Sequence, residues 1–179
     1  MNGNWKILLL FVFFATLSGC ASLREGHEIP PLKAVPELDL QRYMGTWYEI
    51  ARYPNRFQDS CDSDVVAKYS MLSDGKVQVI NSCSEGAGRK IKESRGKAWV
   101  PDSAANAKLK VSFFWPFSGD YWVIDIGSSY EYAVVGTPSR RYLWILSREP
   151  GIDVKTYIEI LQRLRLQGYD PNLLLEAHQ

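Results

Sequence analysis

The stretch from residue 46 to residue 148 constrains the fold most, because it is a succession of short β-like runs with no helical segment between them. Turn residues such as Ser73-Asp74-Gly75 and Gly127-Ser128-Ser129 separate the runs. Eight antiparallel strands in sequence order can close on themselves, which removes both sheet edges and leaves room inside for one small ligand. We therefore predict an all-β, eight-stranded, antiparallel up-and-down barrel with strands at 46–53, 63–72, 76–82, 91–100, 106–114, 120–126, 130–135 and 141–148.

The run from Asn106 to Phe113 indicates which side chains face the interior. Leu109, Val111 and Phe113 alternate with lysine and serine, and such alternation places apolar residues on one face of a strand. A slip of one residue in register would invert each face. Alternation and aromatic content together predict a ligand-lining set of Leu109, Val111, Phe113, Tyr121, Val123, Tyr132 and Trp144.

A C-terminal helix is predicted on the outside of the barrel. The run Tyr142 to Leu146 is apolar on both faces, so a second element must cover its outer side. After Pro150, Asp153 is a suitable N-cap, and apolar residues follow at helical spacing until Gly168. We expect one amphipathic α-helix packed against the last strand.

The N-terminus carries an export signal. The apolar run Ile7 to Leu17 after Lys6 is too short to span a bilayer but suits the core of a signal peptide. The following Leu17-Ser18-Gly19-Cys20 resembles the lipobox of bacterial lipoproteins, which implies cleavage before Cys20 and acylation of its sulfur. Ala21 in place of Asp implies sorting to the outer membrane. The alternative is a plain secretory signal with an incidental cysteine.

Three segments follow from this pattern. Residues 1–19 are the predicted signal peptide, and residues 20–36 are the lipidated cysteine and a flexible tether rich in proline. Residues 37–179 form the predicted barrel domain with its helix. The formal net charge of +1, without a run of Lys or Arg, argues against nucleic acid as a partner.

Cys61 and Cys83 remain as an even pair once Cys20 is acylated. They flank the predicted hairpin of the second and third strands at the end away from its turn, so they lie near each other. In an exported protein such a pair is expected to form a disulfide. Two free thiols in catalysis or metal binding are the rival interpretation, which lacks a nearby histidine.

Composition also argues against an enzyme, a metal site or a bound cofactor. The two histidines are His27 in the tether and His178 beside the C-terminus, which leaves no histidine for a Ser-His or Cys-His active site. Glu49 and Asp125 interrupt apolar strands and are the remaining acid–base candidates. An outward or floor position explains each of them, and a buried Glu49 would alternatively orient the polar head of a ligand.

Two sequence blocks resemble the lipocalin family, most closely its bacterial outer-membrane branch. They are Gly45–Arg52 on the first strand and Leu143–Arg148 on the last, with a weaker match at Ser128-Ser129-Tyr130. The resemblance implies that an Arg at the end of the last strand packs on the first-strand Trp, which corresponds to Arg148 and Trp47. A guanidinium stacked on a sheltered indole stabilises by on the order of 1–2 kcal/mol. Both residues would close the barrel floor.

The resemblance implies a carrier anchored to the periplasmic face of the outer membrane. Its expected ligand is one elongated apolar molecule, such as a fatty acid or lysophospholipid. Asn55 and Arg56, in the first connection, are candidates for the mouth of the barrel. An assembly lipoprotein that uses the barrel exterior and a lipid-modifying enzyme remain as alternatives, and a homodimer is left open.

Overall fold

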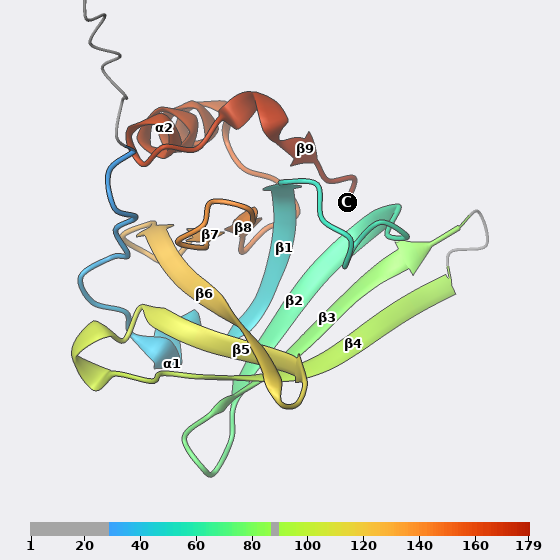
Figure 1. Ribbon diagram of the computed structural model, residues 1–179. Helices are drawn as coiled ribbons and strands as arrows, with labels where there is room; N and C mark the ends of the chain where they lie inside the picture. The colour runs from blue at the N-terminus through green and yellow to red at the C-terminus, as the bar shows by residue number, and fades with distance from the viewer. Residues whose placement is uncertain (1–28, 87–89) are drawn as a thin grey trace, which may run out of the picture.

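The chain folds into a closed antiparallel barrel with a helix on its outside (Figure 1). The computed structural model describes residues 29–86 and 90–179. Strands adjacent in sequence pair in order, and β1 pairs with both β2 and β8, which closes the sheet. The predicted fold class is therefore confirmed. The barrel strands are β1 (Gly45–Arg52), β2 (Ser63–Met71), β3 (Val77–Glu85), β4 (Lys90–Trp99), β5 (Lys108–Phe114), β6 (Phe117–Ile126), β7 (Tyr132–Gly136) and β8 (Leu143–Ser147).

The predicted C-terminal helix is α2 (Val154–Leu166). Its N-cap is Asp153, whose carboxylate accepts a hydrogen bond of 3.0 Å from the Thr156 backbone N–H. The helix ends before Gly168, which has the left-handed φ of +80° that glycine adopts without strain. Ile160 and Leu164 face the barrel and are buried, so α2 covers the outer side of the last strands as expected.

Four short elements were not predicted: α1 (Leu40–Tyr43), η1 (Ser103–Ala105), η2 (Pro171–Leu173) and β9 (Leu175–Glu176). Each is too short to show a hydrophobic period in the sequence. The helix α1 lies at the end of the barrel where β1 begins. The strand β9 pairs with the last residues of β1 at the opposite end.

The two ends of the barrel differ in their connections. Because successive strands alternate in direction, the β2–β3, β4–β5 and β6–β7 connections lie at the end closed by α1. The β1–β2, β3–β4, β5–β6 and β7–β8 connections lie at the other end, which we call the open end. The predicted mouth residues of the first connection are therefore at the open end.

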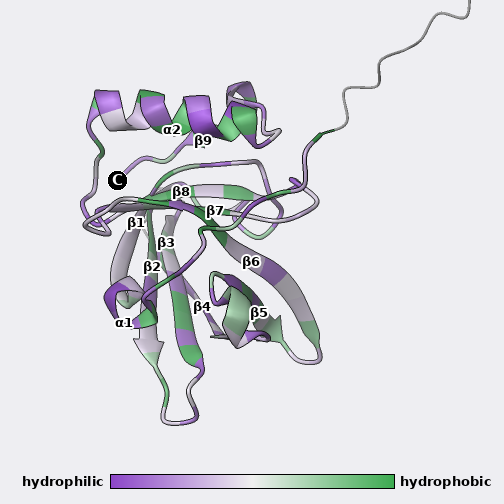
Figure 2. Cartoon of the chain, turned by 90° about the vertical axis from the view of Figure 1, so that its left-hand side faces the viewer, coloured by the Kyte–Doolittle hydropathy of each residue, from purple (hydrophilic) through white to green (hydrophobic). Residues whose placement is uncertain are grey.

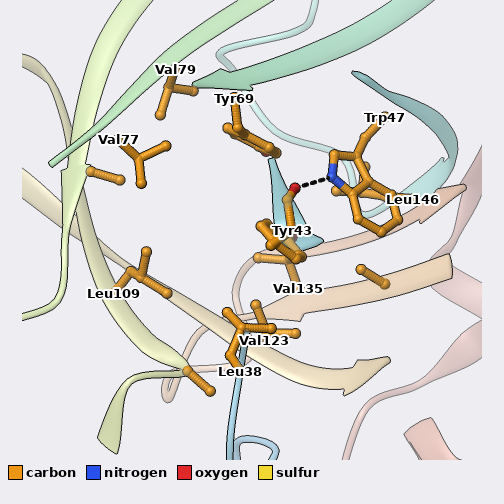
Figure 3. Packing of buried hydrophobic residues seen from close by; sticks show 13 residues of the cluster. Leu38, Tyr43, Trp47, Tyr69, Val77, Val79, Leu109, Val123, Val135 and Leu146 are labelled. Carbon is orange, nitrogen blue, oxygen red and sulfur yellow. Dashed lines mark hydrogen bonds between the residues drawn. The ribbon is translucent and has the colours of Figure 1, made fainter. Parts of the chain in front are cut away.

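Two hydrophobic cores share the barrel wall. The inner core includes Trp47, Leu109 and Val123 (Figure 3). The outer core lies between the barrel and α2, and includes Val134 and Ile160. Alternation along each strand divides its residues between the two cores. In Figure 2 the hydropathy colours accordingly alternate along several strands.

Part of the predicted tether packs against the barrel. The predicted signal peptide, Cys20 and the tether up to residue 28 lie outside the described residues. From there the chain runs along the barrel, because Leu32 and Leu38 are buried and the Val35 N–H donates to Val123 O at 2.9 Å. Residues 29–36, expected to be tether, are therefore packed against the domain.

Candidate functional site

The barrel interior holds most of the predicted ligand-lining residues. Leu109 and Val123 are buried in the inner core. Val111, Phe113, Tyr121 and Trp144 pack against that core and are only partly buried. Inward side chains that stay accessible form the wall that a ligand entering from the open end would touch.

Tyr132 is an exception, and its predicted place in the lining is wrong. Its ring belongs to the outer core under α2, and its hydroxyl accepts a 2.9 Å hydrogen bond from Arg163. The neighbouring Ala133 and Val135 face the interior instead. The prediction chose the wrong face of β7 because all five residues of this short strand are buried, so alternation gave no contrast.

Three tyrosine hydroxyls meet near the closed end. Tyr121 Oη lies 2.8 Å from Tyr43 Oη and 2.9 Å from Tyr69 Oη. Burial raises the pKa of all three phenols, that of Tyr69 to about 12. They line a cavity of about 10 Å³, which is the room of one water. The closed third of the barrel is therefore filled by side chains.

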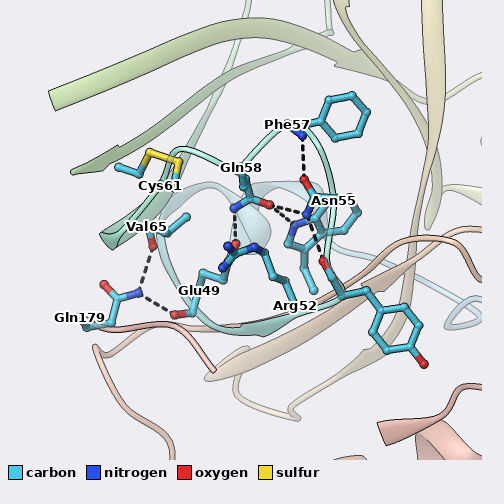
Figure 4. A network of polar contacts seen from close by, with 11 residues as sticks. Glu49, Arg52, Asn55, Phe57, Gln58, Cys61, Val65 and Gln179 are labelled. Atoms are coloured by element: carbon cyan, nitrogen blue, oxygen red, sulfur yellow. Dashed lines mark hydrogen bonds and ion pairs between the residues drawn. A yellow bond between two sulfur atoms is a disulfide. The ribbon is translucent and has the colours of Figure 1, made fainter. Parts of the chain in front are cut away.

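A polar cluster occupies the interior toward the open end (Figure 4). Gln58, on the β1–β2 connection, donates to Glu49 at 2.6 Å and accepts from the Trp144 indole at 2.9 Å. Asn55 donates to the same Gln58 oxygen at 2.9 Å and holds the connection through the Tyr53 carbonyl. Asn55 thus has a structural role at the mouth, whereas Arg56 is exposed.

Glu49 is the most buried acid of this cluster, with 3% of its surface exposed. Burial raises its pKa, opposed by hydrogen bonds from Gln58 and by Arg52. The Arg52–Glu49 ion pair spans 2.9 Å. Two buried atoms of the described residues, Arg52 Nε and Asn81 Oδ1, have no hydrogen-bond partner in the protein. One is a donor and the other an acceptor, and both need a partner when water is excluded.

The barrel floor contains the pair Trp47 and Arg148. The guanidinium carbon lies 3.8 Å from the centroid of the fully buried indole. Arg148 also donates to Thr46 O at 2.9 Å and to Arg42 O at 2.6 Å. The indole N–H donates to Tyr43 O at 2.9 Å. These contacts join the first strand, the last strand and α1.

Cys61 and Cys83 form the predicted disulfide, with a Cα–Cα distance of 5.6 Å. The bond joins the end of the β1–β2 connection to β3. Both cysteines lie at the open end, where the bond braces the long first connection. Rival roles as free thiols are thereby excluded for this pair.

Asp125 lies outside the barrel, paired at 2.6 Å with Arg163 of α2. It is therefore not a partner of Glu49 for acid–base chemistry. Within residues 29–86 and 90–179, no cluster of His, Cys, Asp or Glu is suited to hold a metal ion. No helix in these ranges is long and apolar enough to cross a membrane.

A groove of about 540 Å³ lies on the outside, between the β6–β7 turn and the start of α2. Its wall mixes acidic and basic side chains, among them Arg42, Glu131, Glu149 and Asp153. It shares Arg148 with the barrel floor. The apolar wall and the polar cluster meet in the interior of the barrel.

Sequence reasoning missed Arg52, Gln58 and Asn81 as members of the interior. The polar interruption of β1 at Glu49 was the available signal, and it led to the correct alternative of a buried carboxylate. Gln58 carried no signal because loop side chains have no period.

A closed eight-stranded barrel with one end plugged and a C-terminal helix outside defines a class of cup-shaped, single-domain barrels. Residues 38–179 match a family model described as "Lipocalin-like domain". The chain therefore belongs to the lipocalin family.

Relatives of known name agree. The outer membrane lipoprotein Blc of Escherichia coli K12 is 40% identical over 152 residues, which cover 84% of this chain and 85% of the relative. Temperature-induced lipocalin-1 of Arabidopsis thaliana is 38% identical, with 83% of each chain covered. Insecticyanin of the tobacco hornworm, a solved structure, aligns with a TM-score of 0.67 at 20% identity over 84% of this chain and 85% of its own. That last likeness concerns the fold.

Proposed function

We propose that this lipocalin is a carrier anchored through acylated Cys20 to the periplasmic face of the outer membrane. Its ligand is one elongated lipid with a single acyl chain, a fatty acid or a lysophospholipid. The names of the bacterial relatives, outer membrane lipoproteins, support the location. The lipobox resemblance at Cys20 supports the anchor.

One observation carries the ligand class: a partly accessible apolar wall meets a polar cluster that has hydrogen-bonding atoms to spare. Val111, Phe113 and Trp144 would contact an acyl chain. Arg52 Nε and Asn81 Oδ1 are buried without a protein partner, so a head group that reached them after a side-chain movement would supply the missing acceptor and donor. A head group with both an acceptor and a donor, such as the glycerol of a lysophospholipid, satisfies both atoms.

The same cluster argues for binding without turnover. Each oxygen of Glu49 already accepts a hydrogen bond, one from Arg52 and one from Gln58. These bonds fix the carboxylate among protein partners, so its burial is explained by the network rather than by a reaction. We therefore propose no catalytic residue and no cofactor for the barrel.

The test fills the interior with a side chain. Val111→Trp on the inner face of β5 should abolish binding of a fluorescent lysophospholipid. Lys110→Trp, on the outer face of the same strand, is the matched control and should bind as the parent does, because Lys110 forms an exposed ion pair with Asp120. Circular dichroism confirms that both variants fold.

Mass spectrometry completes the test. Native spectra of the purified protein should show one bound lipid that solvent extraction removes. A parent protein that binds no single-chain lipid, or a Val111→Trp variant that binds as well as the parent, would refute the proposal. Lipid released in hydrolysed or isomerised form would favour an enzyme instead.

A further inference from the structure

Large exposed apolar side chains gather at the open end of the barrel. At the β5–β6 hairpin, Phe114, Trp115 and Phe117 are 80%, 83% and 78% exposed. Phe57 on the β1–β2 connection and Ile91 near the start of β4 are exposed at the same end. The three aromatic residues of the hairpin are neighbours, and such a group of exposed apolar side chains on a small protein indicates an interaction surface.

The hairpin holds these side chains in place. Phe114 pairs with Phe117 across the turn, and Ser112 Oγ donates to Phe117 O at 2.6 Å. The Lys110–Asp120 ion pair of 2.7 Å bridges the same two strands farther from the tip. The hairpin therefore has an apolar tip, formed by Phe114, Trp115 and Phe117, and a charged base, formed by the Lys110–Asp120 pair. Figure 2 shows the hairpin extending from the barrel, with hydrophobic green at the start of β6.

The N-terminal segment leaves the domain beside the β7–β8 connection and the end of α2 (Figure 1). Arg140, on the β7–β8 connection, donates to the carbonyls of Pro30 and Gln167. Eight residues lie between Cys20 and Ile29, so the chain takes nine steps from one to the other, and an extended chain covers at most about 3.3–3.6 Å per residue. A lipid on Cys20 would therefore keep the β7–β8 connection within roughly 30 Å of the membrane surface.

We infer that the open end docks on the lipid bilayer, with Phe114, Trp115 and Phe117 inserted at the boundary between head groups and acyl chains. Aromatic side chains favour this boundary, and the charged base limits how deeply the tip enters. The barrel mouth then faces the membrane, so a lipid passes between bilayer and barrel without crossing bulk water. The inference rests on the anchoring and ligand class proposed above.

A second copy of the chain is the competing occupant of the tip. Two copies joined mouth to mouth would point their Pro30 ends at each other, so their anchors would have to reach back to one membrane around the pair. The short stretch between Cys20 and Ile29 favours a bilayer.

The first experiment locates Trp115. The full-length gene product, purified from membranes, is reconstituted into phosphatidylethanolamine–phosphatidylglycerol vesicles with and without dibrominated phosphatidylcholine. Bromine on the upper part of the acyl chains should quench the tryptophan fluorescence of the parent protein. The Trp115→Phe variant should lose most of this quenching. Trp122→Phe is the matched control and should keep it, because Trp122 lies on the wall of β6 under Lys108. Equal quenching in parent and Trp115→Phe would overturn the inference.

The second experiment separates docking from ligand binding. The double variant Phe114→Ser/Phe117→Ser should take up fluorescent lysophospholipid from vesicles at least about tenfold more slowly, because two large apolar side chains no longer insert. Its affinity for the same lipid supplied as monomers should equal that of the parent. Val154→Ser, an equally exposed apolar site on α2, is the control.

The outcomes are distinguishable. If no variant binds monomeric lipid, the proposed ligand class fails, while the quenching result still decides docking. An unchanged uptake rate in the double variant refutes docking. If the parent forms a dimer that the double variant loses, and bromolipid does not quench the parent, the tip binds a second copy of the chain. This outcome also refutes docking on the bilayer.

Discussion

Replacement of Arg148 by alanine should destabilise the barrel without weakening ligand binding. Arg148 stacks on Trp47 at 3.8 Å and donates to the carbonyls of Thr46 and Arg42. Alanine removes the stacking and leaves two carbonyl groups without their charged donor. The polar cluster toward the open end is formed by other residues, so the ligand site keeps its contacts.

The expected magnitude follows from these contacts. The sheltered cation–π contact accounts for about 1–2 kcal/mol, and the lost hydrogen bonds add about 1–2 kcal/mol more. The free energy of unfolding should therefore fall by on the order of 2–4 kcal/mol. For a domain of this size that corresponds to a melting temperature lower by roughly 5–15 °C.

Urea denaturation followed by far-ultraviolet circular dichroism gives the free energy, and lysophospholipid titration gives the affinity. Arg148→Lys keeps the charge but not the planar stacking, so its loss should be intermediate. Arg165→Ala, an exposed arginine on α2, should change neither quantity. Unaltered stability of Arg148→Ala would refute the role of the floor pair. A large loss of affinity at intact stability would show that the ligand contacts the floor.

Three further predictions concern the interior and the rim. Reduction of the Cys61–Cys83 bond, which spans 22 residues, should cost roughly 3 kcal/mol of stability; identical urea midpoints with and without reductant would contradict this. Burial raises the pKa of Glu49 above 4.5, so the folded state holds this proton more tightly than the unfolded state, and the resulting stability is lost as pH rises through the raised value. Glu49→Gln should lack that decline. Parallel pH profiles of stability for the parent and the variant would contradict this role of Glu49. Tyr121→Phe leaves the Tyr43 and Tyr69 hydroxyls unpaired and should lower the free energy of unfolding, measured by heat or urea, by about 1–3 kcal/mol. An unchanged free energy would show that water replaces the Tyr121 hydroxyl.

Local sequence patterns were sufficient for the fold class. The turn residues and alternation report on the strands, and the N-cap Asp153 with Gly168 marks both ends of α2. These signals act over a few residues, so a single sequence displays them. The disulfide was also predictable, because the order of strands in a meander places Cys61 and Cys83 at one end.

The inward-facing residues were predictable only where burial differs between the two faces of a strand. On β5 the lysines mark the outer face, and Leu109, Val111 and Phe113 were placed correctly inside. On β7 both faces are buried, one by the interior and the other by α2, so the face of Tyr132 depended on register. Register is a property of strand pairing and not of one strand.

The sequence by itself determined an eight-stranded barrel with a covering helix, because periodicity, caps and turns are local. Only the tertiary structure decided which polar groups share the interior, since Glu49, Arg52, Gln58 and Asn81 come from two strands and a connection that folding brings together. It also decided that the N-terminal segment leaves the domain beside the β7–β8 connection. That placement depends on contacts between residues as distant as Pro30 and Arg140, which no local pattern records.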